Sequence, residues 1–210
     1  MSIIMDNFTP GHEPHEPGTK ENPIIDSELT LEEALRPNPN FFLSPEIFER
    51  QIILQVMYIS FDGKFHRGQI VIDKDLEKDV TDFFKILLEQ NFPLNKVVPV
   101  AHKKFNFDDA LSMAQNNSSG FNPRNIAGGD KPSNHAFGRA IDINPFQNPY
   151  IKNDLVEPKG AVYDTGKPGT FAAESPIVQF LKSRGFFWGG DYKDLKDYHH
   201  FEKPLEEVKE

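Results

Sequence analysis

A chain of 210 residues with 38% hydrophobic and 12% aromatic content suits one globular domain that buries a sizeable core. Its net charge of −9 argues against nucleic acid or an anionic membrane surface as the main partner, because both need clustered lysine and arginine. The absence of cysteine excludes disulfides and cysteine nucleophiles, and leaves histidine and carboxylate groups as the ligands for a transition metal.

Residues 1–45 are rich in proline and show little periodicity, and we interpret them as an N-terminal arm before a folded domain at residues 46–210. Within this arm, Thr30 and Glu33 have the spacing of a capping box, which predicts the start of a short helix. Pro37 cannot continue a helix, so this helix is expected to end before it.

The beginning of the arm shows no targeting signal. Residues 1–20 lack a basic segment followed by an apolar one, so no signal peptide is visible. The longest apolar run of the chain is far shorter than a membrane span. His12 and His15, in the polar stretch GHEPHEPG, are expected to be solvated rather than to bind a metal.

Two β-rich runs begin the folded domain. Residues 51–60 and 68–72 are rich in β-branched side chains, and Asp62 with Gly63 supplies a turn between them, which together predict a β-hairpin. His66 lies beside this turn and is expected at the surface.

Three helices are predicted after the hairpin. Asp73 caps the first, whose apolar residues recur at helical spacing and are interpreted as core. A strand, KVVPVA, separates it from the second helix, FDDALSMAQ, for which Asn106 is the expected cap. Ser175 and Pro176 mark the start of the third helix, and Gly185 marks its end.

The segment between the second and third helices is less regular. Residues 146–174 carry repeated proline and glycine, which predicts an irregular loop and makes it a candidate flap over a substrate. FFWGGDY and DYHHFE, near the end of the chain, are predicted strands around a Gly-Gly turn.

The stretch SNHAFGRAIDINP, residues 133–145, places a carboxylate between two isoleucines. Gly138 and the β-branched residues after it predict a tight turn that leads into a short strand. On that strand Asp142 points away from the isoleucines, and a buried carboxylate needs a polar partner. The turn allows His135 to reach Asp142. Their contact is either a structural hydrogen bond or part of a metal site.

A catalytic zinc ion needs three protein ligands and an open position for water. His135, Asp142 and one histidine of DYHH would supply two nitrogens and one oxygen. Adjacent strand residues point to opposite faces, so His199 and His200 are not expected to bind the same ion. Asp197 lies three residues before His200, where its carboxylate could take a proton from the water and return it to a leaving amine.

These motifs resemble a known enzyme family. SNHAFGRAIDINP fills every position of the Ser-x-His-x-x-Gly-x-Ala-x-Asp signature of the D-alanyl-D-alanine carboxypeptidase-like (VanY-type) zinc metallopeptidases, which cut bacterial cell-wall peptides. DYHHFE is similar to their second motif, in which an acidic residue stands three positions before a histidine. FDGKFHRGQIVID, SSGFNPR, INPFQNPY and WGGDYKDLKDYHHFE resemble the branch of L-alanyl-D-glutamate endopeptidases and phage lysins, so the resemblance covers roughly residues 51–202.

The resemblance implies a role for each matching residue. His135, Asp142 and His200 would bind one Zn²⁺ ion, and Asp197 would act as the general base. Many relatives carry glutamate at the position of Asp197, although the endopeptidase-like branch also uses aspartate. A strand register shifted by one residue would exchange the roles of His199 and His200.

Four further residues are implied in handling the substrate. Arg124, in FNPR, matches the arginine that holds the carbonyl oxygen or a carboxylate of the substrate, and it is assigned a catalytic role. Ser133, Tyr198 and Trp188 are assigned to substrate binding, with a place in the core as the alternative for Trp188.

The implied fold is α+β, a small and mainly antiparallel sheet with flanking helices, as in the hedgehog and D-Ala-D-Ala-peptidase-like zinc fold. The implied activity is zinc-dependent hydrolysis of peptidoglycan stem peptides, as an L-Ala-D-Glu endopeptidase or a D,D-carboxypeptidase. A zinc-containing module that binds wall peptides without cutting them is the alternative. We expect a monomer that acts in the periplasm or cell wall if a signal was trimmed, or a lysin made in the cytoplasm if not.

Overall fold

The structure is a computed structural model that describes residues 16–205 and combines α-helices with several small β-sheets. The mixed composition agrees with the predicted class, whereas the described strands form four small sheets instead of one. His12 and His15 lie outside the described residues, so their solvation stays a prediction. No helix within residues 16–205 combines the length and apolar character that crossing a membrane requires.

A long antiparallel hairpin forms one side of the molecule, as predicted. Its strands β2 (Gln51–Ile59) and β3 (Phe65–Asp73) pair along their whole length, and β1 (Ile24–Ile25) adds to β3 in parallel. The turn contains Gly63, with a φ of 77°, and Asp62, whose carboxylate accepts a backbone N–H two residues later. Glycine adopts this φ without strain, so the predicted turn residues are the ones that close the hairpin.

The expectation that His66 lies at the surface is wrong. Strand β1 brings Asp26 beside β3, and the two ring nitrogens of His66 lie 3.2 Å from Asp26 and 3.3 Å from Asp62. The buried ring also stacks on Tyr58. The segment that covers His66 is distant in sequence, which a local pattern around the turn does not reveal.

The segment before the hairpin packs against it. Helix α1 (Leu31–Ala34) begins at Thr30 with the predicted capping box. Ala34 and Leu43 are buried in a cluster that includes side chains from both hairpin strands, and helix α2 (Pro45–Glu49) leads into β2. The division of the chain into an arm and a domain at residue 45 stays a prediction.

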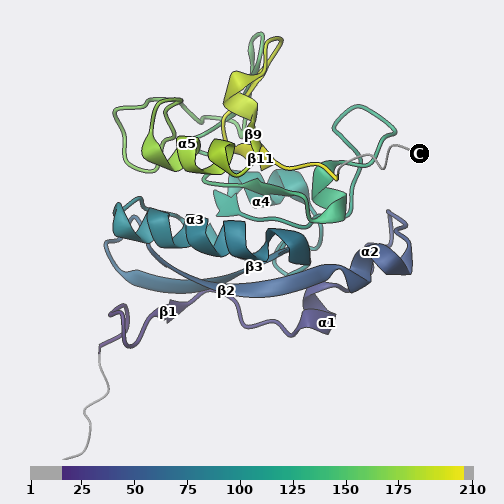
Figure 1. Ribbon diagram of the computed structural model, residues 1–210, viewed down its shortest axis with the longest axis horizontal. Coiled ribbons are helices and arrows are strands. Elements are labelled where there is room, and N and C mark those ends of the chain that lie inside the picture. Colours follow the sequence, from purple (N-terminus) through teal and green to yellow (C-terminus); the bar gives the residue numbers. More distant parts are fainter. Residues whose placement is uncertain (1–15, 206–210) are drawn as a thin grey trace, which may run out of the picture.

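Helix α3 follows the hairpin with the predicted cap. Asp73 caps a 3-10 turn (Lys74–Leu76) that continues into α3 (Glu77–Glu89). The apolar stripe of α3 is buried, as predicted, at Val80, Phe83, Phe84 and Leu87. Figure 1 shows α3 lying between the hairpin and helix α5 (Pro176–Ser183), which begins at the predicted cap Ser175.

The cap of helix α4 (Asp109–Ala114) differs from the prediction. Asp108 caps this helix, and its carboxylate accepts the backbone N–H of Leu111. Asn106 has a φ of 50° and the next residue one of 66°, whereas a cap residue needs an extended backbone. The helix therefore begins at the first suitable side chain after these two residues.

The remaining strands are short. They are β4 (Lys96–Val97), β5 (Asn117–Ser118), β6 (Ala140–Asp142), β7 (Tyr150–Lys152), β8 (Leu155–Glu157), β9 (Phe187–Trp188), β10 (Lys196–Asp197) and β11 (His200–Glu202). They pair in the orders β6-β11-β9, β10-β7-β8 and β4-β5. The prediction that residues 146–174 are irregular is wrong where β7 and β8 form a hairpin on β10. The predicted strand KVVPVA is reduced to β4.

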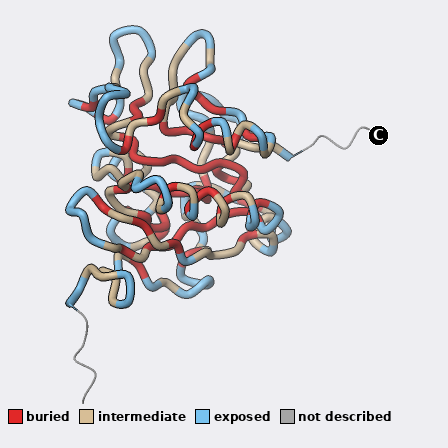
Figure 2. Tube along the Cα trace, turned by 60° about the vertical axis from the view of Figure 1, so that its left-hand side comes forward, coloured by how far each residue is buried: buried red, intermediate tan, exposed pale blue. Residues whose placement is uncertain are grey.

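The main hydrophobic core packs against one face of the sheet β6-β11-β9 and holds its strands in place. It lies between the hairpin, α3, α5 and the sheet β6-β11-β9, and Figure 2 shows buried chain through the middle of the molecule with exposed loops around it. Ile141 of β6 and Phe201 of β11 are fully buried there. Because side chains alternate along a strand, Asp142 and His200 face away from this core.

A substitution at Gly138, which lies between the 3-10 helix that carries His135 and strand β6, tests how strictly the turn requires glycine. It has a φ of 67°, and a β-carbon there would collide with Gln51 Oε1 and lie 2.6 Å from the backbone nitrogen of Asp73. Gly138→Ala is expected to lower the free energy of unfolding by more than the cost of about 1–2 kcal/mol for a left-handed backbone alone.

Gly63→Ala is the matched control, because Gly63 has a φ of 77° and nothing within 4 Å of its β-carbon position. Chemical denaturation of both variants measures the difference. Equal losses of stability would contradict the close approach at Gly138.

Candidate metal centre

The first two residues of the site come from one short stretch. Ser133 caps a 3-10 helix (Asn134–Phe137) by accepting the backbone N–H of His135 at 3.3 Å. Gly138 ends this helix in the left-handed conformation, and Asp142 is the last residue of the strand that follows. The predicted turn and strand are confirmed. The Nε2 of His135 lies 3.0 Å from a carboxylate oxygen of Asp142.

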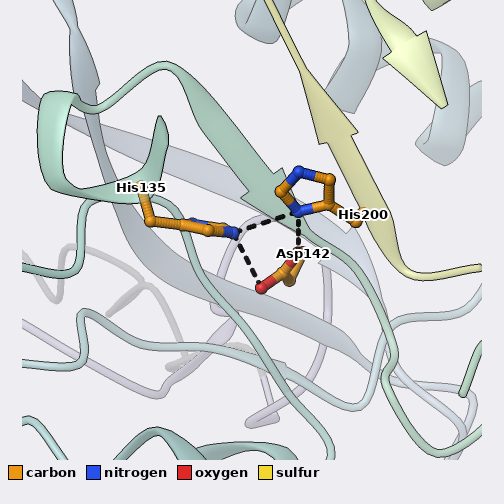
Figure 3. A group of neighbouring side chains, drawn as sticks. All are labelled: His135, Asp142 and His200. Atoms are coloured by element: carbon orange, nitrogen blue, oxygen red, sulfur yellow. Dashed lines mark hydrogen bonds and ion pairs between the residues drawn. The ribbon is translucent and has the colours of Figure 1, made fainter. Parts of the chain in front are cut away.

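The third residue comes from a strand near the other end of the domain. Strand β11 pairs antiparallel with β6, and this register places His200 opposite Asp142. The Nδ1 of His200 lies 3.0 Å from Asp142 and 3.2 Å from Nε2 of His135. Figure 3 shows the three side chains pointing toward one another. Within residues 16–205, no other three histidine or acidic side chains come together in this way.

The outer partners of the two rings determine which nitrogens face the centre. His135 Nδ1 lies 2.7 Å from the carbonyl oxygen of Gly120, which can only accept, so Nδ1 donates. His200 Nε2 lies 3.1 Å from the Glu202 carboxylate and donates to it. In neutral rings the other two nitrogens keep their lone pairs and face Asp142. Three electron-pair donors therefore converge, which a proton or a metal ion has to balance.

Glu202 belongs to the site and was missed by the sequence reasoning. Its carboxylate also accepts hydrogen bonds from Asn134 at 2.7 Å and from Tyr192 at 2.9 Å. Burial opposes its ionisation, but the hydrogen bond and positive charge of His200 outweigh burial and lower the pKa of Glu202 to about 2. The alternation of a strand was the available signal, because Glu202 and His200 share one face.

The charges of the centre depend on one another. Burial disfavours the Asp142 carboxylate, but attraction to His135 and His199 holds its pKa well below its usual range. Burial likewise disfavours a charged His200, yet its hydrogen bonds with Asp142 and Glu202 raise its pKa to about 10. Without a metal, protons on the histidine rings therefore balance the negative charge of the buried Asp142 carboxylate. A divalent cation would take the place of such protons.

The spacing of the two ring nitrogens fits a tetrahedral zinc ion, and the Asp142 carboxylate lies beside both of them. Zinc–nitrogen bonds of about 2.0–2.1 Å at tetrahedral angles separate two ligand atoms by about 3.3 Å. The two ring nitrogens are 3.2 Å apart, and each lies 3.0 Å from an oxygen of Asp142, which is Oδ2 for His135 and Oδ1 for His200. Two imidazole nitrogens and one carboxylate oxygen also form a donor set of catalytic zinc sites. The residues present therefore fit this metal.

Asp197, the predicted general base, lies on β10 and outside the group of three. Its Oδ1 is 2.9 Å from Nε2 of His199, and that nitrogen is 4.0 Å from Asp142. Burial lowers the pKa of His199, but Asp197 and Asp142 raise it to about 9. A β-carbon at Gly189 would collide with the carbonyl oxygen of Asp197. The first glycine of WGGDY therefore allows the backbone at residue 189 to lie close to the backbone of Asp197.

Arg124 lies outside the group of three. Its Nε is 3.2 Å from the carboxylate of Asp109, and one of its terminal nitrogens donates to the carbonyl oxygen of Asn125. Its backbone carbonyl accepts the N–H of Ser133, which connects the two segments. The Ser133 hydroxyl oxygen serves as the helix cap. The predicted roles of Arg124 and Ser133 toward a substrate stay predictions.

The two aromatic residues assigned to substrate binding have different surroundings. Trp188 is only 2% exposed, belongs to the main core and donates its ring N–H to the carbonyl oxygen of Tyr198. This geometry favours the core position for Trp188. Tyr198 is half-buried and stacks on Tyr163, with 3.5 Å between the ring centroids. Tyr163 therefore contacts the turn that follows Asp197, while the role of residues 146–174 as a flap stays a prediction.

Comparison with known proteins gives one finding on the family. No solved structure matches the chain. A family model described as D-alanyl-D-alanine carboxypeptidase matches residues 127–203, a range that contains His135, Asp142, Asp197 and His200 but not Arg124. The match confirms, over these residues, the resemblance to the D-alanyl-D-alanine carboxypeptidase family that the motifs predict.

Proposed function

We propose that this protein is a zinc-dependent peptidase that hydrolyses peptide bonds in the stem peptides of bacterial peptidoglycan. The observation that carries the proposal is the convergence of His135 Nε2, His200 Nδ1 and an Asp142 oxygen in a buried group. The family match over residues 127–203 supports a peptidase. The resemblance of the motifs to enzymes that cut wall peptides supports the substrate class, and hence action outside the cytoplasm.

Each side chain of the proposed site has a separate task. His135, Asp142 and His200 hold one zinc ion. Bound zinc supplies a Lewis acid that polarises the peptide carbonyl and lowers the pKa of water beside it. The Asp197 carboxylate accepts a proton from the attacking water and returns it to the leaving amine. Arg124 binds the carbonyl oxygen or a carboxylate of the substrate.

Two forms of this activity differ in the bond that is cut. A D,D-carboxypeptidase removes a terminal D-alanine, whereas an L-Ala-D-Glu endopeptidase exposes the amino group of glutamate within the stem. The description of the matching family names the first form. FNPR and WGGDYKDLKDYHHFE resemble the second branch, and for this reason we favour the endopeptidase.

Metal content and product release test the proposed function together. Protein purified without chelator should hold about one zinc per chain and release amino groups from purified peptidoglycan, with activity lost on chelation and restored by zinc. Free D-alanine or a new glutamate amino terminus identifies the bond. Zinc without release from any wall type would favour the binding module, and absence of zinc would leave a structural hydrogen bond between His135 and Asp142.

Substitution of the three ligands tests the metal centre. His135→Ala, Asp142→Ala and His200→Ala are each expected to lose bound zinc, because two remaining ligands hold the ion weakly. His102→Ala is the control that should keep zinc, since His102 lies outside the group of three. Metal analysis of the purified variants measures the content. A ligand variant with a full complement of zinc would remove that residue from the centre.

Asp197→Asn tests the general base. The amide cannot accept the proton, so turnover should fall by about 100-fold to 10,000-fold while the zinc content stays unchanged. Asp194→Asn, at an exposed carboxylate three residues earlier, is the matched control and should behave like the wild type. Steady-state rates on the same peptidoglycan substrate give the comparison. Unchanged hydrolysis by Asp197→Asn would contradict the assignment.

A further inference from the structure

His199 is buried, and the proposed function gives it no task. It lies in the turn between β10 and β11 and is 4% exposed. The observed register puts His200 opposite Asp142 and leaves His199 outside the group of three. A buried imidazole needs partners for both of its nitrogens, so the partners of His199 indicate what it does.

Each ring nitrogen of His199 faces one group. Nδ1 lies 2.7 Å from the carbonyl oxygen of Asn148, which can only accept, so Nδ1 donates. Nε2 lies 2.9 Å from Oδ1 of Asp197. The nearest oxygen of Asp142 is 4.0 Å from Nε2, which is too long for a hydrogen bond. The partner of Nε2 is therefore Asp197.

Asn148, whose carbonyl oxygen accepts the N–H of the His199 ring, is itself held in place. Asn148 is fully buried, its side-chain amide donates to the carbonyl oxygen of Gly169 at 2.9 Å, and its side-chain oxygen accepts the N–H of Phe171 at 2.7 Å. The ring of His199 cannot turn away from Asp197 without breaking its own buried hydrogen bond to Asn148, which would be costly.

This arrangement restrains one oxygen of the proposed base. Oδ1 of Asp197 is buried and accepts no hydrogen bond within the described residues, so its contact is the ion pair at 2.9 Å with Nε2 of His199. The second oxygen, Oδ2, is left for the substrate water. A carboxylate with one oxygen held has fewer orientations to lose before it accepts a proton, which favours the reacting geometry.

We propose that His199 is a positioning residue that orients the Asp197 carboxylate for proton transfer. The proposal rests on the proposed function, because it takes Asp197 as the general base. His199 acts through Asp197 and touches neither the substrate nor the metal. It also explains why the chain keeps two adjacent buried histidines, of which only His200 faces the centre.

Two amide variants of His199 separate its two contacts. The amide nitrogen of asparagine can take the place of Nδ1, and that of glutamine can take the place of Nε2. His199→Gln therefore keeps a donor for Asp197, whereas His199→Asn keeps the donor for the Asn148 carbonyl and leaves Asp197 without its partner. Both are made in the full chain, loaded with zinc and assayed on a soluble stem peptide.

The proposal predicts different kinetics for the two variants. His199→Asn should lower kcat by about 10-fold to 100-fold with KM and zinc content unchanged, and His199→Gln should keep kcat near the wild-type value. A loss confined to His199→Gln would mean that only the Asn148 contact matters and would overturn the proposal. Equal losses in both variants, or no loss in either, would overturn it as well.

A measurement without turnover keeps this inference separate from the proposed function. In protein labelled with ¹⁵N in its histidine rings, the Nε2 resonance of His199 should shift when Asp197 is replaced in Asp197→Asn. An unshifted resonance would overturn the pairing. A shifted resonance supports the pairing even if zinc-loaded wild-type protein cuts no wall peptide, and in that case the proposed function fails instead.

Discussion

A carboxylate buried almost completely from water is the constraint on which the second half of this fold depends. Asp142 is 5% exposed, and a buried charge is costly unless close partners compensate it. The turn at Gly138 brings His135 back to this carboxylate, and the pairing of β6 with β11 brings His200 to it from the other side. The proposed zinc ion would complete a balance of charge for which the backbone already provides the geometry.

Features encoded within a few neighbouring residues were predicted well. The capping box at Thr30, the hairpin turn at Gly63 and the turn at Gly138 depend on local backbone preferences, and each is observed. Features that depend on contacts between segments far apart in the sequence were not predicted. The burial of His66 requires β1 to pair with β3, and the hairpin of β7 and β8 consists of strands too short to show an alternating pattern.

The candidate site follows the same division. His135 and Asp142 are recognisable because they belong to one motif. The resemblance of DYHHFE to the family's second motif favours His200, but only the register of β6 with β11 shows that His200 faces Asp142. Glu202 could have been found from strand alternation once that register is assumed. The carbonyl group of Gly120 carries no sequence signal, because every residue has one, and only the folded chain shows that it orients His135.

The pairing of β6 with β11 also sets the order of events when the protein is made. The proposed ligand His200 lies 58 residues after Asp142, so the centre cannot be completed until residue 200 has left the ribosome and its strand has docked. A zinc ion bound at the proposed centre would connect this late strand to an earlier one. Above its dissociation constant, each tenfold rise in free zinc would then stabilise the folded chain by about 1.4 kcal/mol.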